Sequence, residues 1–133
     1  MGLTAYRPEY HLLVDPARNR LCYLCYEALS VAPELPHYLT DWQRALAQLR
    51  PGFTVLTDLS LTRGPNLGLL PTFAAAQQLV VAAGVRAVAE VHPRGSATRQ
   101  TSAALQRESA LPVRIFHSVA DAEAFLNSLP VEA

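Results

Sequence analysis

Two short apolar runs in the middle of the chain flank a longer, alanine-rich one. Residues 53–58 (FTVLTD) and 85–91 (VRAVAEV) have the length and the β-branched content of strands that are buried on both faces of a parallel sheet. Residues 74–83 between them predict a helix, with Pro71 suited to its first turn and Gly84 to its end. Because neighbouring parallel strands need a crossover of this kind, the stretch predicts one βαβ unit.

The segments before this unit predict a hairpin and a helix. Residues 10–15 and 20–28 are strand-like runs joined by a short turn-rich link, which favours an antiparallel pair. From Pro36 onward the apolar positions recur at spacings of three and four, as on one face of an amphipathic helix. We expect this helix to bury Leu39, Trp42, Leu46 and Leu49 and to turn Asp41, Gln43, Arg44 and Gln48 outward.

The segments after the unit predict a weaker helix over residues 97–109, a strand over residues 113–116 and a last helix. That helix starts at Ser118 in a capping-box-like sequence, with an expected buried stripe of Val119, Ala122, Leu126 and Leu129. The order ββαβαβαβα predicts an α/β fold in a single domain over residues 1–133. Its sheet is expected to be open, mostly parallel and five-stranded, with an N-terminal antiparallel hairpin and four helices.

The composition excludes several classes of function. With 50% hydrophobic residues and a formal net charge of zero, the chain has no cationic surplus for a nucleic-acid backbone. All eleven basic residues are arginine, and without lysine a P-loop, a Schiff-base enzyme and the lysine-dependent site of receiver domains are excluded. No stretch has the pattern of a signal peptide or a membrane span, so we expect a cytoplasmic protein without membrane insertion.

Cys22 and Cys25 form a CxxC pair that falls inside an expected strand. Residues three apart in a strand point to opposite faces and lie roughly 10 Å apart, which is beyond disulfide reach. Since the chain has only two cysteines, no second pair can complete a zinc site. We expect two inert, packed thiols and no metal or cofactor.

Polar residues gather where the three later strands end, and ligands of open α/β sheets bind outside such strand ends. Asp58 ends the first of these strands, His92 follows the second, and His117 follows the third. The candidate ligand or partner site is Asp58, Ser60, Arg63, Asn66, Leu67, His92, Arg94 and His117. Helix N-termini would add amide donors for a small anion. The alternative is that these are ordinary loop residues, with Asp58 in a turn and Ser118 in a cap.

No nucleophile can be paired with an adjacent base, because the chain contains no GxSxG, GxGxxG or HExxH pattern. We therefore expect no enzyme. Two segments have few polar residues for a solvent-facing side: residues 70–83, in which only Thr72, Gln77 and Gln78 are polar, and residues 21–28, which are apolar on both strand faces. Either they are covered within the domain, or they meet a protein partner or a second copy in a homodimer.

Residues 53–129 resemble the STAS-like (SpoIIAA-like) family, the sulfate-transporter and anti-sigma-factor-antagonist domain. The matching stretches are Thr54 to Ser60, Leu67 to Leu70 at a helix start, Ala83 to Glu90, Val113 to Phe116, and Val119 to Leu126.

The resemblance implies a non-enzymatic regulatory or protein-interaction domain that contacts a partner through its second helix and the adjoining loop. An alternative is a small anion- or lipid-binding module at the strand ends. At the place where the family's antagonists carry a phosphorylated serine, this chain has Arg63 to Gly68 without a serine. Ser60 and Thr62 lie a few residues too early, so the resemblance does not carry the phosphoacceptor over.

Overall fold

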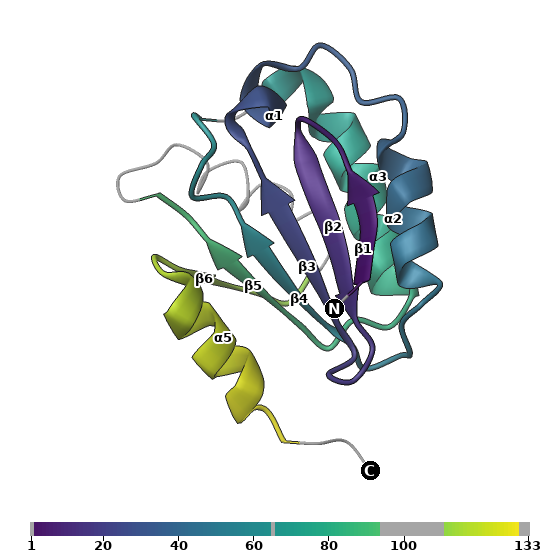
Figure 1. The fold of residues 1–133 in the computed structure, drawn as a ribbon, viewed down its shortest axis with the longest axis vertical. Coiled ribbons are helices and arrows are strands. Elements are labelled where there is room, and N and C mark those ends of the chain that lie inside the picture. Colours follow the sequence, from purple (N-terminus) through teal and green to yellow (C-terminus); the bar gives the residue numbers. More distant parts are fainter. Residues whose placement is uncertain (1, 65, 94–110, 131–133) are drawn as a thin grey trace.

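A computed structural model describes residues 2–64, 66–93 and 111–130 and shows one six-stranded sheet with strand order β1-β2-β3-β4-β5-β6 (Figure 1). The strands are β1 (Gly2–Tyr6), β2 (Tyr10–Asp15), β3 (Arg20–Cys25), β4 (Thr54–Asp58), β5 (Ala87–Val91) and β6 (Val113–Phe116). The helices are α1 (Glu27–Val31), α2 (Tyr38–Leu46), α3 (Leu70–Ala82) and α5 (Val119–Ser128), with a 3-10 turn, η1 (Leu67–Leu69), before α3.

The sheet has an antiparallel start and a parallel remainder. β1 and β2, and then β2 and β3, pair antiparallel, whereas β3, β4, β5 and β6 are parallel neighbours. The predicted α/β class, with an N-terminal antiparallel hairpin followed by parallel strands, is therefore confirmed. The predicted number of five strands is wrong, because β1 adds a sixth strand at the edge, with an irregular register between Leu3 and Ala5.

The helices cover the two faces of the sheet unequally. α2 joins β3 to β4, and α3 joins β4 to β5; these two helices pack side by side on one face (Figure 1). α5 packs against β4, β5 and β6 on the other face. The short helix α1 was not predicted, and the helix predicted over residues 97–109 lies outside the described residues.

Each face has its own hydrophobic cluster, as the alternation of a pleated strand requires. Leu21, Val55 and Val88 belong to the cluster beneath α2 and α3. Leu56 and Ala89 belong to the cluster beneath α5, together with Ala122 and Leu126 of that helix. The central strands are thus apolar in sequence because both of their faces are buried.

The helix ends follow the predicted local chemistry. In α3, Pro71 occupies the first turn, and Gly84 has a φ of 92° just past the end. The N–H groups of Gly84 and Val85 donate to the carbonyl oxygens of Val81 and Val80, which is the pairing of a Schellman motif. In α5, the Ser118 hydroxyl accepts from the Asp121 N–H at 3.1 Å, so the predicted cap is confirmed.

The interior position of β3 decides between two explanations of its apolar sequence. β3 lies between β2 and β4, hydrogen-bonded to both. The explanation that β3 is an edge strand completed by a second copy is therefore wrong.

The predicted orientation of α2 is wrong in one important respect. Asp41 is fully buried and Leu39 is exposed, so the inward face of the helix is Tyr38, Asp41, Trp42 and Ala45. Leu46 and Leu49 pack only partly against the core. The helix turns this face inward because Arg7 and Tyr10 are there to hydrogen-bond the Asp41 carboxylate. The local pattern of apolar residues cannot reveal these partners.

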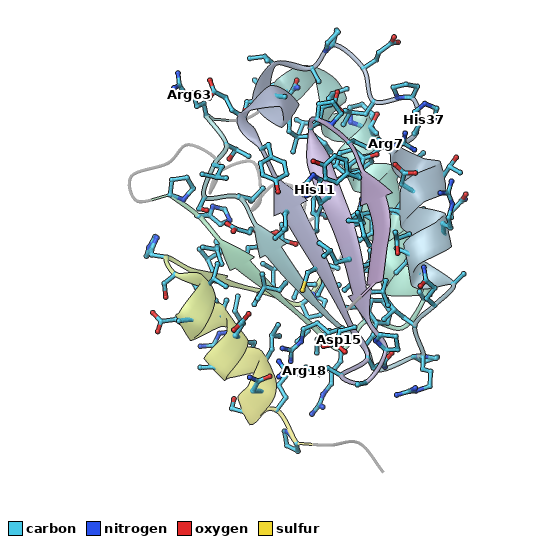
Figure 2. The ribbon with its side chains drawn as sticks, in the orientation of Figure 1. Arg7, His11, Asp15, Arg18, His37 and Arg63 are labelled. Atoms are coloured by element: carbon cyan, nitrogen blue, oxygen red, sulfur yellow. The ribbon has the colours of Figure 1, made fainter. Side chains whose placement is uncertain are left out.

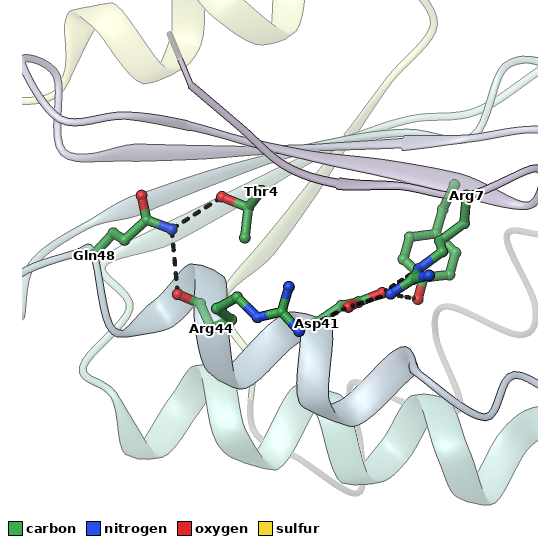
Figure 3. A network of polar contacts seen from close by, with 6 residues as sticks. Thr4, Arg7, Asp41, Arg44 and Gln48 are labelled. Atoms are coloured by element: carbon green, nitrogen blue, oxygen red, sulfur yellow. Dashed lines mark hydrogen bonds and ion pairs between the residues drawn. The ribbon is translucent and has the colours of Figure 1, made fainter.

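Asp41 connects α2 to β2 and to the turn between β1 and β2 (Figure 3). The Arg7 guanidinium donates to both of its oxygens at 2.9 and 3.0 Å, and the Tyr10 hydroxyl donates at 2.6 Å. Burial alone would raise the pKa of Asp41, but these hydrogen bonds and the charges of Arg7 and Arg44 lower it below its usual value. A second contact, from Gln48 of the following turn to the Thr4 hydroxyl at 3.0 Å, holds β1 to the same segment.

We expect Asp41→Asn to destabilise the fold by about 2 kcal/mol at pH 7, because charge-assisted hydrogen bonds are replaced by poorer ones. A carboxyl group whose pKa is lowered in the folded state stabilises the protein at pH values above its unfolded-state pKa of about 4. This stabilisation is lost as the pH falls through the folded-state pKa. The stability difference between wild type and variant should therefore shrink below about pH 4 in urea unfolding curves. Asp15→Asn, at a looser surface pair with Arg18 (3.8 Å), is the control and should change stability by less than about 0.5 kcal/mol. An acid-independent difference for Asp41→Asn would contradict this account.

Candidate functional site

A cavity of about 120 Å³ lies between the sheet and the helices α2 and α3. Strand residues form its floor, α2 and α3 form one wall, and α1 with the loop that follows β4 forms another. The lining residues are Tyr23, Leu29, Ser30, Tyr38, Trp42, Val55, Thr57, Leu59, Thr62, Gly64, Asn66, Phe73, Ala76, Gln77, Val80, Val88, Glu90 and Leu111. Most of this lining is apolar, so the cavity favours an apolar occupant.

The floor contains a row of polar residues that the strand register creates. Tyr23 of β3 is the partner of Thr57 of β4, and Thr57 is the partner of Glu90 of β5. All three are buried and line the cavity. The row two residues earlier, Leu21, Val55 and Val88, is wholly apolar. The polar row therefore lies toward the C-terminal ends of the parallel strands, where ligands of open α/β sheets gather.

Aromatic rings surround the apolar part of the cavity. The ring centroids of Tyr23 and Trp42 are 5.0 Å apart, those of Tyr38 and Phe73 are 5.6 Å apart, and both pairs meet edge to face. Aromatic pairs in this geometry are stabilised beyond the contribution of their buried area. The aromatic wall is thus contributed jointly by β3, α2 and α3.

The polar atoms of this wall are only partly satisfied. The Tyr38 hydroxyl donates to the Tyr23 hydroxyl at 2.8 Å, and burial raises the pKa of both phenols well above the usual value. The indole N–H of Trp42 has no hydrogen-bond partner among the described residues, although the side chain is only 4% exposed. The indole lies near enough to Tyr38 to oppose the burial-driven rise in the pKa of that phenol, but their geometry is not that of a hydrogen bond.

Glu90 and His92 form a buried pair at the β5 end of the polar row. The Nε2 atom of His92 lies 2.8 Å from Oε1 of Glu90, and both residues are less than a tenth exposed. A neutral imidazole with its proton on Nε2, or a protonated one, donates this hydrogen bond. Without such a partner, burying a glutamate carboxylate in a strand would cost a large desolvation free energy.

The structure places Asp58 and Ser60 in a turn at the end of β4. The Asp58 carboxylate accepts from the Ser60 N–H at 2.9 Å, as in an Asx-turn. Ser60 itself is exposed. This geometry agrees with the alternative given above, in which Asp58 serves the local backbone.

Arg63, Asn66 and Leu67 lie on the loop between β4 and α3. Arg63 is exposed, pairs with Glu27 of α1 at 3.2 Å, and points outward from the sheet (Figure 2). Asn66 donates from its side-chain nitrogen to the carbonyl oxygens of Leu29 and Ala32 at 2.8 and 2.9 Å. Leu67 is 64% exposed. Of these three residues only Asn66 lines the cavity.

His92 and His117 are brought together by the pairing of β5 with β6. The His92 N–H donates to the Phe116 carbonyl oxygen at 2.9 Å, and Nδ1 of His117 lies 3.3 Å from the His92 carbonyl oxygen. His92 is buried, whereas His117 is exposed. Arg94 lies outside the described residues, so the predicted anion site of Arg63, His92, Arg94 and His117 is described only in part. Of its described members, His92 and His117 are in contact, whereas Arg63 pairs with Glu27.

The two cysteines face opposite sides of the sheet, as their spacing predicts. Cys25 belongs to the cluster beneath α2 and α3, and Cys22 packs against the cluster beneath α5. Both thiols are free, and burial is the main cause that raises the pKa of each above its usual value. No group of three or more potential metal-ligating side chains occurs among the described residues.

Sequence reasoning missed Trp42, Thr57 and Glu90 as cavity residues. The available signal was the alternation within residues 54–58 and 87–91, where Thr57 follows Val55 and Leu56 and where Glu90 interrupts an otherwise apolar strand. That pattern shows that a position is polar, but it does not show which residues of other strands and helices lie next to it. The register and the orientation of α2 bring these residues to one space.

No family model matches the chain, and neither a curated protein nor a solved structure matches it. Within the described ranges, none of the helices combines the length and the apolar character needed to cross a bilayer. The STAS-like resemblance therefore stays a prediction.

We expect Cys22 and Cys25 to react slowly with iodoacetamide in the folded protein, because alkylation needs an accessible thiolate. The same chain unfolded in urea is the control and should react at the rate of ordinary thiols. Mass spectrometry after timed labelling measures both. Rapid formation of a Cys22–Cys25 disulfide in the folded protein, under a mild oxidant, would show that the strand positions are incorrect.

We expect Asn66→Asp to destabilise the fold by about 2 kcal/mol, because a carboxylate cannot donate to the carbonyl oxygens of Leu29 and Ala32. Amide hydrogen exchange should also become faster in α1. Asn127→Asp, at an exposed position of α5, makes the same chemical change and should stay within about 0.5 kcal/mol of wild type. Equal effects of the two substitutions would mean that Asn66 does not hold the loop to α1.

Proposed function

We propose that this chain is a non-enzymatic, STAS-like regulatory domain that binds a small, mainly apolar molecule in the cavity beneath α2 and α3. The observation that carries the proposal is the cavity itself, with aromatic and aliphatic walls and a short row of polar residues along its floor. Small-molecule sites have this composition, with a few polar groups that orient the ligand.

The size of the cavity limits the ligand. A volume of about 120 Å³ is close to that of an apolar protein cavity of about 150 Å³ that accepts benzene. Drug-sized ligands occupy larger pockets, of roughly 300 Å³ or more. The ligand is therefore expected to have about the size of a six-membered ring.

A binding role is favoured over catalysis by the hydrogen bonds of the lining. Nucleophilic catalysis needs a nucleophile next to a base. The Tyr38 hydroxyl donates to Tyr23, and the Thr62 hydroxyl donates to the Leu59 carbonyl oxygen. The Cys25 thiol, with its raised pKa, is not part of the cavity lining.

The loop after β4 gives this binding site a route to a protein partner. Gly64 and Asn66 line the cavity, whereas Leu61 and Leu67 of the same loop are 59% and 64% exposed. Asn66 also fixes the loop to α1. We infer that a ligand in the cavity acts on this loop and so on a protein that contacts Leu61 and Leu67, which agrees with the partner role that the resemblance implies.

Filling the cavity tests the proposal. We expect benzene to raise the melting temperature of the wild-type protein, since a ligand that binds only the folded state stabilises it. Trp42 is the only tryptophan in the chain, and its fluorescence should respond to benzene as well. Ala76→Leu, which places a larger side chain in the cavity, should abolish both responses.

Ala75→Leu is the matched control, because Ala75 lies on the same helix and is not part of the cavity lining. This variant should keep the response to benzene. If benzene has no effect on the wild-type protein, or stabilises the two variants equally, the cavity is not a binding site.

A further inference from the structure

The unsatisfied indole N–H of Trp42 specifies one chemical property of the ligand. Well over 90% of buried backbone donors, and most buried side-chain ones, have an acceptor in folded proteins. Trp42 is 4% exposed and lines the cavity, yet its N–H has no acceptor within the described part of the chain. Since an indole N–H can only donate, the group that satisfies it must be an acceptor.

The charges around the cavity exclude an anionic ligand. Among the described lining residues, Glu90 is the only ionisable acid or base apart from the tyrosines, and none of them is an arginine. A buried anion would meet the Glu90 carboxylate, and the described lining residues offer no cation to compensate the repulsion, which is a costly arrangement. This departs from the anion-binding alternative based on the strand ends.

A cationic ligand is disfavoured for a different reason. The Glu90 carboxylate is already hydrogen-bonded by His92 at 2.8 Å, so a cation would have to displace or compete with an established partner. Most of the remaining described lining residues are aromatic or aliphatic, and the polar ones are uncharged, which suits an uncharged ring.

We propose that the cavity selects a neutral, ring-sized apolar molecule with one hydrogen-bond acceptor, such as a cyclic ketone or a phenol-like alcohol, and that this acceptor bonds the Trp42 indole N–H. The inference rests on the proposed function, because it names the class of ligand for the same cavity. Trp42 is a specificity-determining residue in this account, whereas the walls supply most of the affinity.

Two probes of nearly equal shape isolate the role of the acceptor. Methylenecyclohexane has a CH₂ group at the position where cyclohexanone has its carbonyl oxygen. The chain has one tryptophan, so its indole N–H gives a single signal in a ¹H–¹⁵N correlation spectrum. Cyclohexanone should move this signal downfield, as a new hydrogen bond does, and methylenecyclohexane should move it much less.

Trp42→Phe gives an independent measurement by removing the N–H and keeping an aromatic ring. Because a ketone loses more hydration than an alkene, the quantity to compare is the ratio of the two dissociation constants, measured by NMR titration of backbone amides. This ratio should change by roughly five-fold between wild type and variant in the direction that disfavours the ketone, as expected for one net hydrogen bond.

The outcomes separate the inference from the function on which it rests. If neither probe binds wild-type protein, the cavity is not a ligand site and the proposed function fails. If both bind, but the indole signal does not move and the ratio is unchanged in Trp42→Phe, the acceptor inference fails while the proposed function stands. Tighter binding of cyclohexanecarboxylate or cyclohexylammonium than of cyclohexanone would also overturn the inference.

Discussion

The buried carboxylate of Asp41 fixes the face that α2 turns toward the sheet. Arg7 and Tyr10 hold both of its oxygens, and a buried charge with such partners tolerates little rotation of its helix. Tyr38 and Trp42 lie on the same helix face and are therefore directed inward. The aromatic wall of the cavity thus depends on an ion pair that lies outside the cavity.

The sheet supplies the other half of the site through its register. Parallel pairing of β3, β4 and β5 aligns Tyr23, Thr57 and Glu90 in one row. Because side chains alternate between faces, these residues share the face covered by α2 and α3, and the opposite face holds the cluster of Leu56 and Ala89 beneath α5. The hydrogen bond between His92 and Glu90 allows a carboxylate to lie in a strand that is otherwise made of small apolar residues.

The loop after β4 links the interior of the domain to its surface. Asn66 replaces hydration at two carbonyl oxygens of the α1 segment, and the neighbouring Leu67 is exposed. A segment that contacts the cavity on one side and solvent on the other is suited to report occupancy. The STAS-like resemblance implies partner contacts at the second helix and this same loop.

The sequence by itself determined those features that depend on local periodicity and capping. The βαβ unit, the hairpin of β2 and β3, the Gly84 and Ser118 caps, and the opposite faces of Cys22 and Cys25 all follow from spacing along the chain. β1 escaped prediction because a short edge strand is recognised by its pairing with β2 rather than by its own five residues.

Only the tertiary structure decided the orientation of α2 and the composition of the cavity. Two faces of that helix offer comparable apolar stripes, and the choice between them is made by Arg7 and Tyr10, which lie more than thirty residues away in sequence. In the same way, Thr57 and Glu90 belong to different strands and become neighbours only through strand register. Interactions between distant segments carry no periodic signal. For that physical reason, Asn66 alone of the predicted site residues is among the described residues that line the cavity, and Trp42, Thr57 and Glu90 were not predicted.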